Sequence, residues 1–167
     1  MVYLHNSPLF HSSGCARLLA AVTCLAVNSI LPRFEPAAVL HGIEMQRVTH
    51  VILVPTMLNR LLHSPEFAAS DLSSLTHCVY GASSMPEAVL CRALARLPKV
   101  RFIQSYGMTE LSPAATVLPP KYHVLEGPLA GKIKSIGPPI PLIAKCRTAK
   151  SKCADRWSCK VIGNNPN

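Results

Sequence analysis

The chain has 167 residues, of which 49% are hydrophobic and 15% charged, and its formal net charge at pH 7 is +9. This composition is too apolar for a disordered protein, and the length allows one domain or a piece of a larger one. Proline is frequent, with 15 residues, whereas aromatic residues make up only 5%. These proportions argue against a coiled coil, a helical bundle or an aromatic-rich nucleic-acid platform.

The positive charge is concentrated near the end of the sequence. Residues 145–167 contain one acidic residue, Asp155, and six basic ones. Periodicity is lost there, so residues 146–167 are expected to form a disordered basic tail. The net charge therefore says little about the body's partners, and no specific nucleic-acid partner is expected. The alternative is a tail that binds nucleic acid or an anionic membrane by salt-sensitive attraction, without stacking, because Trp157 is its only aromatic residue.

The seven cysteines form no CxxC metal pattern. Cys15, Cys24, Cys78 and Cys91 lie in apolar runs, where free cysteine behaves as a small buried hydrophobe. We expect free thiols in a reducing, intracellular setting, in the cytoplasm or in an organelle. No transmembrane segment is expected, because the most apolar stretch, residues 18–31, is interrupted by polar residues and is shorter than the ~20 residues needed to span a bilayer. It favours a buried helix, and the first residues lack the basic opening of a signal peptide.

Helical and strand-like segments alternate along the first hundred residues. In chain order, the sequence predicts helices at 15–27 and 36–46, a strand at 51–54, a helix at 56–63, a strand at 78–80, a helix at 86–97 and a strand at 100–103. This alternation is typical of an α/β fold with a largely parallel sheet and flanking helices. Residues 119–141 contain six prolines and are expected to be rich in loops.

The segment that follows the last predicted strand carries the most informative residues. Tyr106 is able to stack on a base, and Gly107 lets the backbone approach a ligand closely. Thr109 offers a hydroxyl to a phosphate oxygen, and Glu110 offers a hard carboxylate to Mg²⁺. On the residues alone, the alternative is a turn in which Thr109 caps a short helix and Glu110 is solvated.

Two other segments carry weaker signals. The strand at 78–80 ends at Gly81, and Ser84 with Glu87 fits a capping box that opens the next helix, with Pro86 in its first turn. Such a small-residue loop also lets a ligand approach free backbone N–H groups. His11 precedes the first predicted helix and is able to orient a carboxylate or act as an acid or base, or else to cap or pack against that helix.

In this order, the segments resemble motifs of the adenylate-forming superfamily, which includes the AMP-forming acyl-CoA synthetases, the luciferases and the peptide-synthetase adenylation domains. Residues 106–110 are identical to the Y-G-M-T-E signature of many acyl-CoA ligases. Four further motifs match in collinear order: P-x-F-H-x-x-G at 8–14, R-F-[DE]-P at 33–36, D-L-S-S-L with G-A-x-x-M-P at 71–86, and G-K-x-x-S-x-G-x-P at 131–139. The resemblance covers residues 3–145 and implies that 1–145 form part of an N-terminal AMP-binding domain.

The resemblance implies that a carboxylic acid, of fatty or medium-chain type, is activated by ATP and Mg²⁺ to an acyl-adenylate and then transferred to coenzyme A. It implies nucleotide binding by Gly81, Ala82, Ser83, Gln104, Tyr106, Gly107 and Thr109. It also implies Mg²⁺ binding by Glu110, substrate binding by His11, Gly107 and Met108, and catalytic roles for Thr109, Glu110 and His11.

The sequence also departs from the family pattern. The glycine-rich phosphate loop with its lysine, the ribose-binding T-G-D aspartate and the mobile C-terminal domain with its lysine do not occur in it. Tyr80 and Ser84 stand where a small residue and proline are common, and the pattern stops after Lys145. We therefore expect a piece of a ligase with little activity on its own, because positioning and phosphate electrostatics are incomplete. The alternative is a non-catalytic remnant that weakly binds a nucleotide or a partner.

Overall fold

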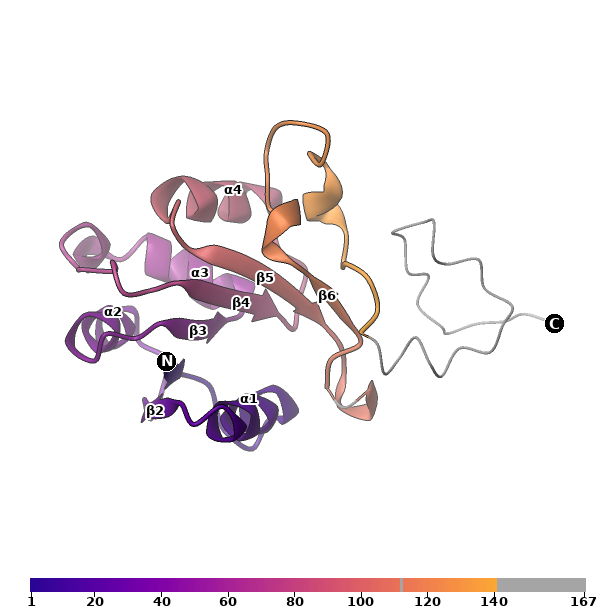
Figure 1. The fold of residues 1–167 in the computed structure, drawn as a ribbon. Helices are drawn as coiled ribbons and strands as arrows, with labels where there is room; N and C mark the ends of the chain where they lie inside the picture. Colours follow the sequence, from indigo (N-terminus) through magenta and orange to yellow (C-terminus); the bar gives the residue numbers. More distant parts are fainter. Residues whose placement is uncertain (112, 141–167) are drawn as a thin grey trace.

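The computed structural model describes residues 1–111 and 113–140, which form one sheet with helices on both sides (Figure 1). The strands are β1 (Val2–His5), β2 (Val27–Ile30), β3 (His50–Leu53), β4 (His77–Gly81), β5 (Arg101–Tyr106) and β6 (Thr116–Leu118). The helices are α1 (Ser12–Thr23), α2 (Pro36–Met45), α3 (Pro55–Leu62) and α4 (Glu87–Arg96), with 3₁₀ turns η1 (Pro65–Ala68), η2 (Thr109–Leu111), η3 (Pro120–Tyr122) and η4 (Lys132–Lys134). The predicted α/β class and the largely parallel sheet are confirmed.

The strand order β2-β1-β3-β4-β5-β6 determines where helices and ligands can lie. The first five strands are parallel, and β6 runs antiparallel to β5. From β1 to β2 the chain moves across the sheet in one direction. From β2 through β3 and β4 to β5 it moves in the opposite direction. Because crossovers between parallel strands are right-handed, this reversal places α1 on the face opposite α2, α3 and α4 (Figure 1). Doubly wound sheets of this order bind ligands beyond the carboxyl ends of the strands, at the reversal point, here between β1 and β3.

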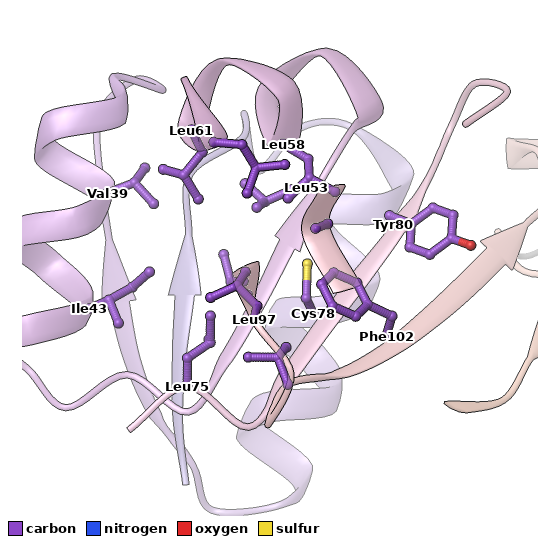
Figure 2. Packing of buried hydrophobic residues seen from close by; sticks show 14 of the residues in the cluster. Val39, Ile43, Leu53, Leu58, Leu61, Leu75, Cys78, Tyr80, Leu97 and Phe102 are labelled. Carbon is purple, nitrogen blue, oxygen red and sulfur yellow. The ribbon is translucent and has the colours of Figure 1, made fainter. Parts of the chain in front are cut away.

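The hydrophobic core lies between the sheet and α2, α3 and α4 (Figure 2). Strands β3, β4 and β5 contribute Leu53, Cys78 and Phe102, whose neighbours along each strand point to the other face. In α3, Leu58 and Leu61 are three residues apart and meet these side chains on one helix face. Burial raises the pKa of the Cys78 thiol to about 12, so this cysteine is a neutral core residue.

The first predicted helix begins and ends earlier in the chain than expected, and most of its residues are not buried. It ends at Thr23, and Val27 belongs to the unpredicted strand β2. Leu25 adopts a left-handed φ of 52° that reverses the chain between the two elements, and its side chain is 94% exposed. A continuous apolar run does not distinguish helix from strand, which is why the boundary was wrong. Two of the cysteines expected to be buried, Cys15 and Cys24, are instead exposed. All four cysteines in the described residues are free thiols, as expected.

Other local predictions also need correction. Strands β1 and β6 were not predicted, and residues 104–106, expected in a loop, continue β5. The capping box is wrong as well, because Pro86 is the N-cap of α4 and no side-chain cap hydrogen bond forms. Glu87 instead pairs with Lys134 at 3.0 Å, which links α4 to η4. Among the described residues, none of the helices has the length and apolarity needed to cross a membrane.

Candidate functional site

The carboxyl ends of β4 and β5 bring several predicted site residues side by side. Gly81 pairs in register with Ser105, and Tyr80 pairs with Gln104. Immediately after the strand, Ala82 adopts a left-handed φ of 67°, a conformation that costs a non-glycine residue roughly 1–2 kcal/mol. Ala82 and the following serine, Ser83, are exposed. The chain therefore turns sharply at the edge where this fold binds ligands, and presents backbone there instead of bulky side chains.

Two glycines are required at this edge because the backbone is packed against them. A Cβ atom at Gly81 would overlap the carbonyl oxygen of Ser105 on the neighbouring strand. A Cβ atom at Gly107 would overlap the carbonyl oxygen of Pro113, where the chain folds back after η2. Both glycines thus allow the backbone to pack closely next to Tyr106, which ends β5 and is half-buried.

A hydrogen bond joins the signature segment to the histidine motif. Thr109 Oγ1, at the start of η2, donates to Ser12 Oγ at the start of α1 over 3.2 Å, although 97 residues separate them. His11 is the N-cap residue of α1 and is exposed, and no side-chain cap hydrogen bond forms there. Thr109, Glu110 and Met108 are also exposed. The structure thus brings the segment around His11 and the Y-G-M-T-E segment together at the carboxyl edge of the sheet.

The Glu110 carboxylate is the kind of oxygen ligand that a hard cation such as Mg²⁺ prefers. In the part of the chain that the structure describes, no group of three or more His, Cys, Asp or Glu side chains is arranged to hold a metal ion. Mg²⁺ is commonly held by one or two carboxylates, with waters and substrate phosphates filling its other positions. A single exposed carboxylate at Glu110 fits that mode of binding.

A buried tyrosine–histidine pair, which sequence reasoning missed, supports β4 just before Gly81. His123 Nδ1 lies 3.2 Å from the carbonyl oxygen of Pro119 and donates to it, so Nε2 accepts from the Tyr80 hydroxyl at 3.0 Å. Burial raises the pKa of Tyr80 and lowers the pKa of His123. No local pattern predicts this contact, because 43 residues separate the two partners. It explains why a large residue is accommodated at position 80.

Acid is expected to destabilise the fold through this pair. Because the pKa of His123 is lower in the folded than in the unfolded chain, its contribution is complete above pH ~6.5 and is lost as pH falls towards the folded pKa. Urea unfolding between pH 7.5 and 5 should show the free energy of unfolding falling, by at most about 1.4 kcal/mol per pH unit for one group. The variant His123→Gln, whose amide also accepts from Tyr80, should show a shallower slope. An unchanged slope in this variant would exclude His123 as a source of the effect.

One further polar side chain lies at the point where the strand order reverses. Asn6 directly follows β1 and is only 1% exposed, and neither its Oδ1 nor its Nδ2 has a hydrogen-bond partner among the described residues. Leaving a buried amide unpaired costs about 1–3 kcal/mol. Hydrogen bonding at the reversal point is therefore incomplete. The sequence offered no signal for it, since burial of Asn6 depends on the packing of distant elements.

Comparison with known proteins decides the family. The sequence profile described as "AMP-binding enzyme" matches residues 1–147. The chain belongs to the AMP-binding enzyme family. The resemblance inferred from the motifs is thereby confirmed. The predicted tail at 146–167 lies outside the described residues.

The relatives of this chain are much longer than the chain itself. Feruloyl-CoA synthase from Amycolatopsis sp is 36% identical over 135 residues, which cover 80% of this chain and 26% of that protein. The N-terminal domain of FACL13 from Mycobacterium tuberculosis, solved with an inhibitor, has a TM-score of 0.67 and 26% identity over 72% of this chain and 30% of that one. O-succinylbenzoate coenzyme A synthetase (MenE) from Bacillus subtilis, in complex with ATP and magnesium ion, has a TM-score of 0.66 and 30% identity over 83% of this chain and 27% of that one. The chain thus spans about a quarter of its relatives and corresponds to part of the N-terminal domain.

Proposed function

We propose that the chain is the nucleotide-binding piece of an AMP-forming acid–CoA ligase. The observation that carries the proposal is the hydrogen bond between Thr109 and Ser12, because it joins the Y-G-M-T-E segment to the histidine motif at the carboxyl edge of the sheet. Relatives that include a feruloyl-CoA synthase and an ATP- and magnesium-bound synthetase support it. Free thiols in the described cysteines fit the intracellular setting that such a ligase would need.

In this proposal, the exposed edge of β4 and β5 binds the nucleotide. The aromatic ring of Tyr106 stacks on the base, while Gly81, Ala82, Ser83 and Gln104 surround it. Glu110 binds Mg²⁺, and Thr109 contacts a phosphate oxygen with its hydroxyl, which leaves Ser12 when the ligand arrives. Bound ATP supplies an activated α-phosphate with pyrophosphate as the leaving group.

The carboxylic acid substrate lies on the α1 side of the same edge. His11, exposed at the N-cap of α1, orients the carboxylate, because an imidazole N–H donates to a carboxylate oxygen. Gly107 and Met108 lie between the nucleotide and the acyl group, where the backbone folds closely against Gly107. Coenzyme A is the acceptor of the acyl group in this proposal, and relatives named as CoA synthase and coenzyme A synthetase support it.

The 167-residue chain by itself is expected to bind Mg-ATP weakly and to lack ligase turnover. It spans only about a quarter of the relatives, so much of their positioning and electrostatic machinery has no counterpart in it. The non-catalytic alternative is a remnant that weakly binds a nucleotide or a partner, and in it any Mg-ATP binding would not depend on Tyr106 and Glu110.

Calorimetric titration with Mg-ATP distinguishes the two. Glu110→Gln should weaken binding by roughly ten-fold, the loss of one charged interaction of about 1.5 kcal/mol, and should abolish the advantage of Mg-ATP over ATP alone. Tyr106→Leu should weaken binding with and without Mg²⁺. Glu126→Gln, at an exposed glutamate outside the proposed site, is the matched control and should bind as the unaltered chain does. Absence of Mg-ATP binding, or equal affinity in all four proteins, would favour the remnant.

A further inference from the structure

The two edges of the sheet differ in how they are covered. At one edge lies β6, where the Val117 N–H donates to the carbonyl oxygen of Pro138 at 3.1 Å and the Ile140 N–H donates to that of Ala115 at 2.9 Å. At the other edge lies β2, which pairs with β1 on its inner side (Figure 1). Among the described residues, no segment pairs with the outer side of β2. The sheet therefore has one covered edge and one open edge.

The backbone hydrogen bonds of β2 show which of its groups face the open edge. The N–H groups of Val27 and Leu31 donate to carbonyl oxygens on and just before β1, at 3.1 and 2.8 Å. Alternate residues of a parallel strand bond to opposite sides, so Ser29 also faces β1. Asn28 and Ile30 therefore point their N–H and C=O groups away from β1, towards the open edge.

One flank of α1 lies beside this open edge. The buried residues Gly14 and Ala21 face the sheet. Cys15, Leu19 and Val22 follow the i, i+4, i+7 spacing about a quarter turn further round the helix, and all three are exposed. Because the crossover from β1 through α1 to β2 is right-handed, this quarter turn directs them away from β3 and past β2. We call these three residues the α1 stripe.

The α1 stripe and the open edge form one uncharged apolar surface, the β2–α1 surface. Leu25, Val27 and Ile30 add side chains that are each more than half exposed. Residues 18–32 contain no charged side chain, whereas open edge strands are usually protected by charges. The exposed side chains offer roughly 600 Å² in one copy and thus about 1,200 Å² in two, which reaches the range of stable protein interfaces.

We propose that a second copy of the chain binds the β2–α1 surface, in a dimer with twofold symmetry whose two β2 strands pair antiparallel. The outward-facing groups of β2 are self-complementary in this arrangement. With Ser29 on the twofold axis, Asn28 of each copy exchanges both backbone hydrogen bonds with Ile30 of the other copy. Because the pairing uses the open edge of both copies, assembly stops at the dimer.

The same pairing brings the two α1 helices to packing distance. Each α1 contacts β1 and β2, so its axis lies over this strand pair. In a continuous sheet the two axes are then two strand spacings apart, about 9.6 Å, within the 8–10 Å at which helices pack. The two α1 stripes face each other across the axis. The proposed nucleotide site, at the ends of β4 and β5, lies away from this interface and stays open in the dimer.

Two other occupants of the β2–α1 surface make different predictions. The basic segment 145–167 finds no acidic side chain in residues 18–32 to attract it. The longer relatives contain further polypeptide, but this chain spans only about a quarter of them. Either occupant would cover the open edge within one polypeptide, independently of protein concentration. A second copy covers it only when the concentration is high enough for dimers to form.

Sedimentation velocity of the full chain over a range of concentrations tests the dimer, in a reducing buffer because Cys15 and Cys24 are exposed. The mass should reach twice that of the monomer at about 50 μM, since interfaces of this size bind at micromolar Kd or tighter. Leu19→Glu should raise the dimer Kd by roughly 100-fold or more, because two carboxylates then meet across the axis. Leu125→Glu, at an exposed leucine elsewhere, is the matched control and should leave the Kd unchanged. A monomer at every concentration, or an unchanged Kd in Leu19→Glu, would overturn the proposal.

A backbone substitution tests the strand pairing itself. Ile30→Pro removes an N–H that faces the open edge, and edge strands accept proline on that side, so the monomer should keep its fold by circular dichroism. The dimer Kd should rise roughly ten-fold or more, because one hydrogen bond is lost on each side of the axis. A folded Ile30→Pro variant that dimerises as tightly as the unaltered chain would contradict the pairing.

Amide hydrogen exchange of the unaltered chain gives a test that needs no variant. The amides of Asn28 and Ile30 should become more protected as the protein concentration rises, since they are bonded only in the dimer. The amide of Ser29, which faces β1, should be protected at all concentrations. Protection of Asn28 and Ile30 that does not depend on concentration would show that the same polypeptide covers the edge, and would overturn the proposal.

Discussion

Replacing Gly81 with alanine is expected to lower the free energy of unfolding by about 2–3 kcal/mol, the cost of forcing extra volume into a packed structure. The added Cβ atom would overlap the carbonyl oxygen of Ser105, to which Gly81 is paired in register. Because the obstacle is backbone, the overlap is relieved only by separating β4 from β5. Urea unfolding monitored by circular dichroism measures the loss, and weaker Mg-ATP binding should accompany it if the proposed site is correct.

Gly42→Ala is the matched control for this substitution. Gly42 lies inside α2, and a Cβ atom there would lie 3.7 Å from Leu4 Cδ1, an ordinary contact distance. Alanine in a helix interior is more stable than glycine by about 0.5–1 kcal/mol, so this variant should be slightly more stable than the unaltered chain. The two substitutions thus have expected effects of opposite sign. If both lower stability equally, backbone contact at Gly81 is not the cause.

Truncating Phe102 to alanine should be even more costly. The side chain is 1% exposed and packs in the core beside Cys78 and Tyr80 (Figure 2). Large-to-alanine changes of buried aromatic residues cost about 3–5 kcal/mol, a large share of the ~5–15 kcal/mol by which ordinary domains are stable. We expect a strongly lowered midpoint in thermal and urea unfolding.

Phe10→Ala provides the comparison, because the Phe10 ring is 85% exposed. Surface substitutions of this kind usually change stability by less than about 0.5 kcal/mol. A loss at Phe10 comparable to that at Phe102 would show that the ring is covered in solution, and would contradict its exposed position beside His11.

The sequence predicted those helices and strands whose apolar pattern matches the burial of their side chains in the structure. Apolar runs interrupted by proline and glycine located α2, α3, α4 and β3, because those elements bury one continuous face. Strand β2, with the sequence Val-Asn-Ser-Ile, was missed because its polar residues are explained only by contacts such as that of Asn28 with His5. Strand β6 was missed because it lies among prolines and, within the sheet, pairs with the late part of β5.

The candidate site likewise has one part that the sequence predicts and another part that it does not. Tyr106, Gly107, Thr109 and Glu110 form a contiguous motif that is recognisable without a structure. The partners that hold the edge in place are far apart in sequence: Thr109 and Ser12 are separated by 97 residues, and Tyr80 and His123 by 43. Such contacts depend on strand order and register, which a single sequence does not specify. Asn6 is a further case, since nothing in its neighbourhood predicts that an amide there is buried without partners.

The long separation of Thr109 and Ser12 also has a kinetic consequence. These two residues meet only after β1, β3, β4 and β5 have aligned, and pairing of distant parallel strands is slow because loop-closure entropy opposes it before the contacts form. A chain that has assembled only α3, α4 and the strands beneath them would already bury much apolar surface, yet its nucleotide edge would be open. Nucleotide affinity should therefore recover in the slowest phase of refolding, after most of the secondary structure has returned.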